Sequence, residues 1–131
     1  MRIYAIDTEE YNFLDFGDKQ NVKILWLDDE RDPMFWIPQC AEKVDIKLVT
    51  NSSEFLNAIK NGGYKEYNLI CMDHDLGDDS EDGEVCAKLL KEEIEHERAF
   101  GNLEMVLIHS SNYSGKKRMF NILNDIDYEN N

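Results

Sequence analysis

Residues 22–33 read VKILWLDDERDP, and this stretch decides the fold. Every position from 22 to 27 except Lys23 is apolar, which is typical of a strand covered on both faces of a sheet. The strand then meets a run of acids, and Pro33 prevents its ladder from continuing. The stretch therefore predicts a buried parallel strand with an acidic carboxyl end.

Three more segments along the chain have strand character. Residues 46–49 form a short strand, 69–72 (LICM) are apolar throughout, and 105–108 (MVLI) repeat the pattern. The segment at residues 2–6 has the alternating pattern of a strand and is the remaining candidate to pair with an edge strand of the sheet. We therefore expect an additional N-terminal strand there.

Helical patterns separate these strands. A short helix is expected around 35–44, and a second begins where Asn51 and Glu54 form a capping-box pattern and ends at the glycines 62–63. A long helix is expected from Gly83 to about Phe100, and a last one near 116–123. Strands that alternate with helices predict an α/β fold with a doubly wound parallel sheet, ordered 2-1-3-4 plus the N-terminal strand. We expect one domain overall, with residues 1–21 as an N-terminal strand and connection and 22–131 as its main part.

The composition restricts the classes of partner. The net charge is −14, from 28 acidic and 14 basic residues, so phosphate backbones are repelled and general nucleic-acid binding is not expected. No apolar run approaches 18 residues, so we expect no membrane partner. Cys40, Cys71 and Cys86 show no CxxC spacing, which favours buried thiols in a cytoplasmic protein.

Acidic residues follow two strands that should be neighbours. Asp28 and Asp29 come after the first core strand, and Asp73 follows the strand at 69–72. Carboxylates that converge raise each other's pKa unless a cation intervenes. Mg²⁺, or Mn²⁺ in its place, suits such a site, and the backbone carbonyl of Asp75 is a further expected ligand. The alternative is that these acids only solvate loops or cap helices.

Two histidines lie in the same loops. His74 follows Asp73 directly, and His109 ends the strand at 105–108. Imidazole titrates near neutral pH, so both are candidates for general acid–base catalysis beside metal-binding acids. A structural role, in which each histidine bonds to a neighbouring loop, stays open. His96 lies on a charged helix face and is expected to be solvated.

Several residues are candidates for phosphate binding. Ser110, Ser111 and Asn112 precede a helix whose first N–H groups can bind an anion, and the alternative is an ordinary N-cap loop. Arg31 either clamps a phosphate or pairs with a neighbouring acid, and Lys116 offers positive charge from the last helix. These groups predict a small phosphorylated ligand.

The motifs also resemble a known family. The segments ILWLDDE and NLICMDHDLG, with Asp-Gly at 82–83, are similar to receiver domains of response regulators. Together, LDDERDP, MDHDLGDD and IHSSNYSGKKRM resemble the divergent group described as the cyclic-phosphate processing receiver domain, from about Val22 to Leu123. The resemblance implies a flavodoxin-like fold and activity on cyclic phosphates. It also implies that Asp28 and Asp29 are metal ligands, that Asp73 is a ligand or phosphoacceptor, and that Ser110 replaces the switch hydroxyl.

The chain departs from ordinary receivers at one important position. No clear fifth strand with the usual Lys-Pro follows residues 105–108, and that lysine contacts the phosphoryl group in receivers. A phosphoaccepting switch is therefore the less favoured hypothesis. The leading hypothesis is a metal-dependent phosphoesterase in which Asp73, His74, His109 and Ser110 are catalytic. The alternative is a non-catalytic binding module with a structural metal site.

Overall fold

The structure, a computed structural model, describes residues 1–6, 21–29, 43–76, 82–110 and 112–126. Its strands are β1 (Arg2–Ile6), β2 (Asn21–Leu27), β3 (Lys43–Val49), β4 (Leu69–Met72) and β5 (Met105–His109). Its helices are α2 (Ser52–Ile59), the 3₁₀ segment η2 (Lys60–Glu66), α3 (Gly83–Glu97) and α4 (Tyr113–Asn124).

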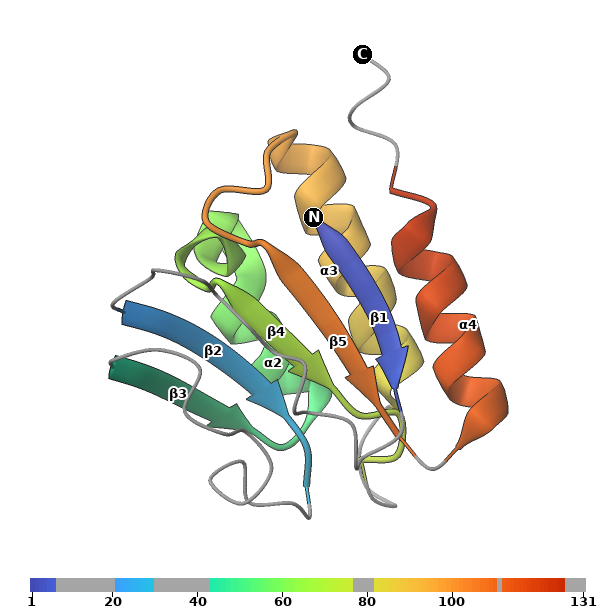
Figure 1. Cartoon of the computed structure of the whole chain (residues 1–131). Coiled ribbons are helices and arrows are strands. Elements are labelled where there is room, and N and C mark those ends of the chain that lie inside the picture. The colour runs from blue at the N-terminus through green and yellow to red at the C-terminus, as the bar shows by residue number, and fades with distance from the viewer. Residues whose placement is uncertain (7–20, 30–42, 77–81, 111, 127–131) are drawn as a thin grey trace.

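The strands form one five-stranded sheet in which every pairing is parallel, with the order β1-β5-β4-β2-β3 (Figure 1). The expected order 2-1-3-4 numbered the strands from the first core strand, which is β2. It therefore corresponds to β3-β2-β4-β5, and this is the order observed. The expected N-terminal strand is also confirmed, because β1 pairs with β5 from Arg2 opposite Met105 to Ile6 opposite His109. The predicted α/β fold with a parallel, flavodoxin-like sheet is therefore confirmed.

Both faces of the central strands are buried, as their apolar sequences predict. The described α-helices lie against one face of the sheet (Figure 1), where Leu25, Ile70 and Val106 join the main core. A second buried cluster on the opposite face includes Trp26, Cys71 and Leu107. Side chains alternate between the faces along each strand, so a continuous apolar run supplies both clusters.

The capping pattern predicted for α2 is present, with one difference in its partner. The Asn51 Oδ1 atom accepts the Glu54 N–H at 2.9 Å, and the Glu54 carboxylate reaches back to Thr50 instead of Asn51. The hydrogen bonds from the Thr50 N–H and hydroxyl favour the ionised carboxylate and lower the pKa of Glu54. The helix ends at Ile59, and Gly62 turns the chain with a φ of +80°.

Several element boundaries differ from the sequence prediction, among them the end of α2, which lies at Ile59 and not at the glycines 62–63. Most of the helix expected around 35–44 lies outside the described residues, but Lys43 and Val44 already belong to β3. The helix α3 ends at Glu97 because Arg98 adopts a left-handed conformation and its N–H bonds to the Ile94 carbonyl at 2.8 Å. The last helix begins at Tyr113, earlier than expected, because Asn112 caps it.

The cysteines and the described helices bear on two expectations drawn from the composition. Cys71 and Cys86 are fully buried, as predicted, and Cys40 lies outside the described residues. Within the part of the chain that the structure describes, every helix is too short or too polar to cross a membrane.

The edge strand β1 contributes to stability through Ile3, which is partly buried against the main core. We expect Ile3→Ala to lower the free energy of unfolding by about 1–2 kcal/mol, below the range for a fully buried isoleucine. Urea denaturation measures this, with the exposed Arg2→Ala as its control. Equal stability of the two variants would mean that β1 does not pack in solution as it does here.

Candidate metal centre

The order in which the chain adds strands to the sheet reverses between the neighbouring parallel strands β2 and β4. From β2 it continues to β3 on one side, whereas from β4 it continues to β5 on the other. In open α/β sheets the crevice at such a switch point, beyond the carboxyl ends of the strands, is where ligands bind. Leu27 pairs with Met72, the last residues of their strands, so the residues that follow both enter this crevice.

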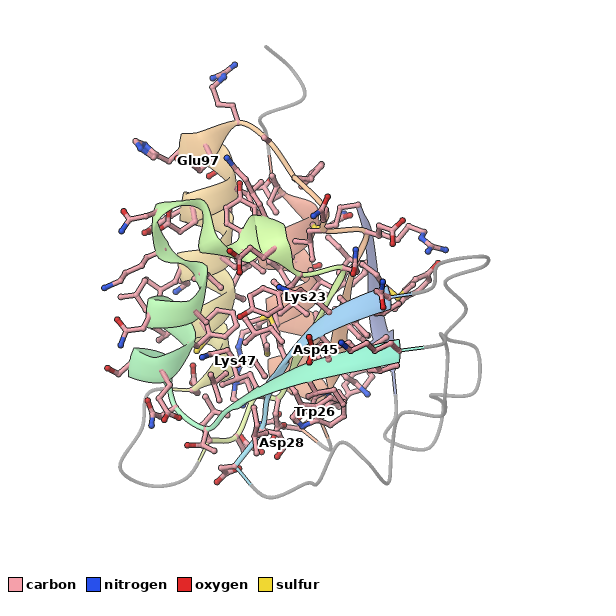
Figure 2. The ribbon with its side chains drawn as sticks, turned by 90° about the vertical axis from the view of Figure 1, so that its left-hand side faces the viewer. Lys23, Trp26, Asp28, Asp45, Lys47 and Glu97 are labelled. Atoms are coloured by element: carbon pink, nitrogen blue, oxygen red, sulfur yellow. The ribbon has the colours of Figure 1, made fainter. Side chains whose placement is uncertain are left out.

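Asp28, Asp29 and Asp73 converge there. Each offers a carboxylate oxygen, and these oxygens lie within 4.8 Å of one another. Sheet-like bonds fix their backbone, since the Asp28 N–H donates to the Val49 carbonyl at 3.1 Å and the Asp73 N–H to the Leu27 carbonyl at 2.9 Å. Figure 2 shows Asp28 just beyond Trp26 at the end of β2. The predicted meeting of the three acids is confirmed.

The donor set fits a hard divalent cation. Asp28 is 1% exposed and Asp73 is 4% exposed, while Asp29 is open to solvent. Two carboxylates removed from water beside a third favour the binding of a compensating positive charge. Oxygen-only donors with one open side match Mg²⁺ or Mn²⁺, which keep several waters. The carbonyl of Asp75, predicted as a fourth ligand, stays a prediction.

The imidazole of His109 contacts one of the three aspartates, Asp28. Its side chain is 0% exposed, and its Nε2 atom lies 3.1 Å from the Asp28 Oδ2 atom. The ring also stacks on Trp26, with centroids 4.6 Å apart and an angle of 22° between the planes. A residue held in this way orients the Asp28 carboxylate. The catalytic role predicted for His109 stays a prediction.

We expect His109→Gln to weaken Mg²⁺ binding by about 10- to 100-fold, as is usual when a partner that orients a metal ligand is lost. Isothermal titration measures the affinity. The control is His96→Gln, since His96 is exposed on α3. Unchanged affinity in folded His109→Gln would show that Asp28 does not depend on the histidine.

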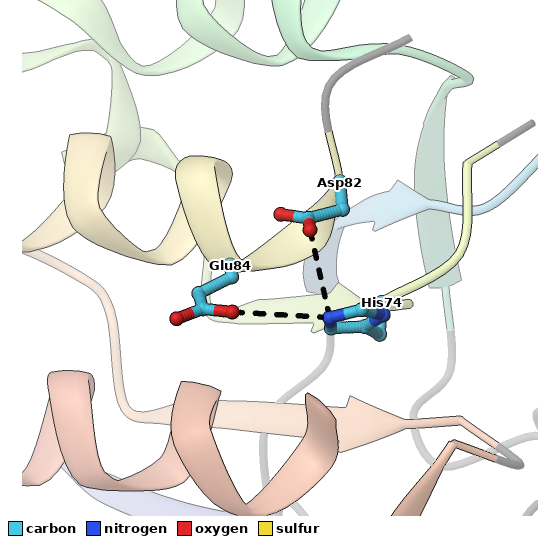
Figure 3. Close-up of side chains that lie close together, drawn as sticks. All are labelled: His74, Asp82 and Glu84. Carbon is cyan, nitrogen blue, oxygen red and sulfur yellow. Dashed lines mark ion pairs between the residues drawn. The ribbon is translucent and has the colours of Figure 1, made fainter. Parts of the chain in front are cut away.

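His74 occupies a second group of polar side chains that the sequence did not reveal. Its Nε2 atom lies 3.7 Å from Asp82 Oδ2 and 4.0 Å from Glu84 Oε2 (Figure 3). Asp82 and Glu84 flank the first residue of α3, where acids are common because they favour the positive end of a helix dipole. Their role at the helix start is enough to explain these acids in the sequence, so the sequence did not indicate a contact with His74. The fold brings the start of α3 next to the loop after β4.

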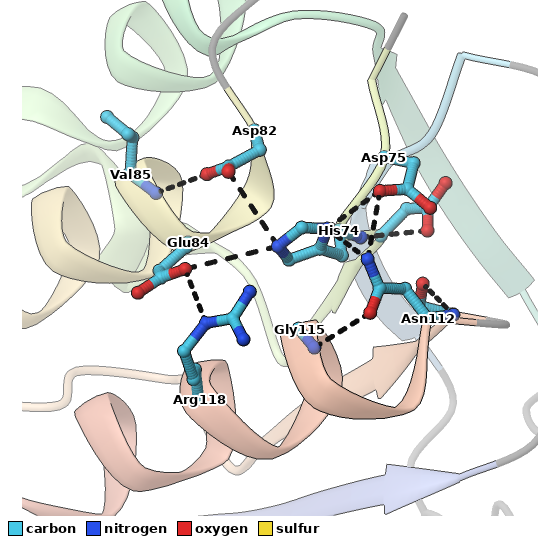
Figure 4. A network of polar contacts seen from close by, with 10 residues as sticks. His74, Asp75, Asp82, Glu84, Val85, Asn112, Gly115 and Arg118 are labelled. Carbon is cyan, nitrogen blue, oxygen red and sulfur yellow. Dashed lines mark hydrogen bonds and ion pairs between the residues drawn. The ribbon is translucent and has the colours of Figure 1, made fainter.

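The other ring nitrogen of His74 joins the start of α4 (Figure 4). Its Nδ1 atom lies 2.8 Å from Asp75 Oδ1, and the Asn112 side-chain amide lies within 3.4 Å of both groups. Asn112 also accepts the Gly115 N–H at 2.9 Å, so the N-cap alternative is confirmed for it. Phosphate binding by Asn112 stays a prediction.

Four other residues were predicted to take part in catalysis or phosphate binding: Ser110, Lys116, Arg31 and Ser111. Ser110 is buried, and its hydroxyl accepts the Asn112 N–H at 3.1 Å. Lys116 is 7% exposed and lines a groove between β1 and α4 together with Tyr4 and Phe120. Arg31 and Ser111 lie outside the described residues, so their roles stay predictions.

Comparison with known proteins agrees with this architecture. A family model described as the cyclic-phosphate processing receiver domain matches residues 23–125, most of the chain. The match begins within β2 and ends just after α4, so it does not include β1. Comparisons with curated proteins and with solved structures gave no match.

Proposed function

Because this chain belongs to the cyclic-phosphate processing receiver domain family, we propose that it hydrolyses a cyclic phosphate or related phosphoester with the help of a divalent metal ion. The convergence of Asp28, Asp29 and Asp73 at the switch point of the sheet is the observation that carries this proposal. In the reaction, water adds to phosphorus and one ring P–O bond breaks, which yields a phosphomonoester and a hydroxyl group.

The residues of this site have distinct roles in the proposal. Asp28, Asp29 and Asp73 hold Mg²⁺ or Mn²⁺, and such an ion neutralises negative charge on phosphoryl oxygens. His109 positions the Asp28 carboxylate through the 3.1 Å contact. Within the same proposal, the candidates for contacts with the phosphate groups of the ligand are the side chains of Arg31, Ser110, Ser111, Asn112 and Lys116.

A substrate screen tests this function. Cyclic mononucleotides and RNA ends that carry a 2′,3′-cyclic phosphate are incubated with the protein, with and without Mg²⁺ or Mn²⁺. Phosphorus NMR separates the ring phosphate from the monoester product. We expect turnover of at least one substrate that needs metal and is lost in Asp73→Asn, whereas Asp45→Asn, an exposed change on β3, keeps it.

A non-catalytic binding module is the second candidate, and the burial of both histidines favours it. His74 is 5% exposed and His109 is 0% exposed, so neither is placed openly for proton transfer with a ligand. This candidate predicts that cyclic phosphates bind in the presence of Mg²⁺ without conversion. Titration of the same compounds, followed by phosphorus NMR of the recovered ligand, separates binding from turnover.

A further inference from the structure

We propose that His74, Asp82 and Glu84 form a second cation site, selective for a borderline transition metal such as Zn²⁺ and distinct from the Asp28, Asp29 and Asp73 site. The proposal is independent of the hydrolytic function. It rests on the arrangement of these side chains where the loop after β4 meets the start of α3 (Figure 3).

The geometry is close to that of a bound metal. The Nε2 atom of His74 and one carboxylate oxygen each from Asp82 and Glu84 all lie within 4.8 Å of one another. Ligands about 2.0–2.2 Å from a tetrahedral cation are roughly 3.3–3.6 Å apart. The observed separations from Nε2, 3.7 Å to Asp82 and 4.0 Å to Glu84, need only small side-chain movements to reach this.

The buried imidazole supplies the observation that points to a ligand. The His74 side chain is only 7% exposed, and its Nε2 atom has no hydrogen-bond partner within the described part of the chain. The Asp75 carboxylate, 2.8 Å from Nδ1, favours the tautomer that carries its proton there. The Nε2 lone pair then faces two carboxylates. A cation bound between the nitrogen and the two carboxylates would make this arrangement favourable.

The surrounding backbone holds this nitrogen in place. A Cβ atom on Gly115 would lie 2.3 Å from His74 Cδ2, so the ring packs directly on the first turn of α4. The Gly83 N–H donates to the His74 carbonyl at 2.7 Å, which ties the loop to α3. A ring oriented by a carboxylate on Nδ1 and fixed by packing is the usual environment of a metal-ligating histidine.

The two carboxylates keep an oxygen available for a cation. Asp82 uses Oδ1 to cap α3, accepting the Val85 N–H at 3.2 Å, and presents Oδ2 to His74 (Figure 4). Glu84 Oε2 accepts the Arg118 Nε–H at 2.9 Å and has a second lone pair for a metal. Arg118 is half exposed, so its charge is screened by water and moderates the affinity without blocking the site.

The donor atoms determine which metal each site prefers. Imidazole nitrogen suits Zn²⁺ and related transition metals, whereas oxygen-only donors suit Mg²⁺. Zn²⁺ at His74 would join the loop after β4 to α3. It would also restrict the position of Asp73, because the backbone N–H of His74 donates to Asp73 Oδ1 at 2.8 Å.

The test titrates Zn²⁺ into the full chain in saturating Mg²⁺, which occupies the oxygen-only site. Calorimetry gives the stoichiometry, and ¹⁵N-detected histidine spectra report on Nε2 of His74. We expect one bound Zn²⁺ and a shift of that resonance. Asp82→Asn, which keeps the helix cap, and Glu84→Gln should each weaken binding at least about 10-fold. The exposed Glu92→Gln on α3 should leave the affinity unchanged.

An additional variant separates the two sites. Asp28→Asn should lose Mg²⁺ binding and keep the Zn²⁺ response of His74, which shows that one site does not depend on the other. An Nε2 resonance that does not respond to Zn²⁺, or an unchanged affinity in both Asp82→Asn and Glu84→Gln, overturns the proposal.

Discussion

Asp73→Asn should abolish the stabilisation that Mg²⁺ gives to this fold. In the wild type, a cation that binds only the folded state adds about 2.7 kcal/mol when its concentration is 100 times Kd. For a chain of this length, that corresponds to a rise in Tm on the order of 10 °C. The variant lacks one of the two buried carboxylates, so its Tm should stay the same when Mg²⁺ is added.

The metal-free proteins should show the opposite order of stability. Without a cation, the carboxylates of Asp28, Asp29 and Asp73 repel one another. The asparagine side chain in Asp73→Asn removes one charge and keeps an oxygen that can accept the His74 N–H. The apo variant should therefore be at least as stable as the apo wild type. Asp45→Asn makes the same chemical change at an exposed position of β3 and should keep the Mg²⁺ response.

Thermal melts with and without Mg²⁺ measure all three proteins. A wild-type Tm that does not change with Mg²⁺ would mean that the three aspartates do not bind the ion. The basis of the proposed hydrolysis would then be lost. A Tm rise that persists in Asp73→Asn would place the bound ion elsewhere. The His74 site does not confuse the result, because its mixed nitrogen and oxygen donors do not favour Mg²⁺.

The sheet was predictable from sequence because its strands are buried on both faces. Apolar runs such as Ile24–Leu27 and Leu69–Met72 have few alternatives, and each meets an acid where the strand ends. Parallel pairing then aligns Leu27 with Met72, which makes the convergence of Asp28 and Asp73 a consequence of the topology. Their meeting needed no knowledge of side-chain conformations.

Contacts between side chains distant in the sequence were not predictable in this way. His109 was expected to face a ligand, but strand register and stacking on Trp26 turn its Nε2 toward Asp28, 81 positions away in the sequence. Asp82 and Glu84 fit the composition of a helix start, so nothing in their local pattern indicated His74. Both cases depend on how elements pack, and local periodicity does not determine packing.

The edge beside β5 explains why the usual receiver lysine was not found. A fifth strand is present, but it is supplied by Arg2–Ile6 from the N-terminal side, outside the residues that the family model matches. A strand from this end of the chain carries its own sequence to the crevice edge, without the Lys-Pro of ordinary receivers. The strand that pairs with β5 at this edge reads RIYAI and contains no lysine.

Gly83→Ala should be strongly destabilising, although alanine normally favours a helix over glycine by about 1 kcal/mol. A Cβ atom at this position would lie 1.9 Å from the Asp73 carbonyl oxygen and 2.9 Å from the His74 Cα. These are backbone atoms of the loop that positions both cation sites, so no side-chain rotation relieves the clash. We expect a loss of about 3 kcal/mol or more, at the upper end of overpacking effects.

Urea denaturation compares Gly83→Ala with two other variants. The exposed Lys88→Ala on α3 should change stability little. Gly115→Ala should fall between them, because its new Cβ meets the His74 ring, which can shift more easily than backbone. Movement of the loop in Gly83→Ala also displaces Asp73, so the folded fraction should bind Mg²⁺ more weakly than the wild type. A Gly83→Ala protein as stable as the wild type would mean that the loop after β4 does not lie against α3.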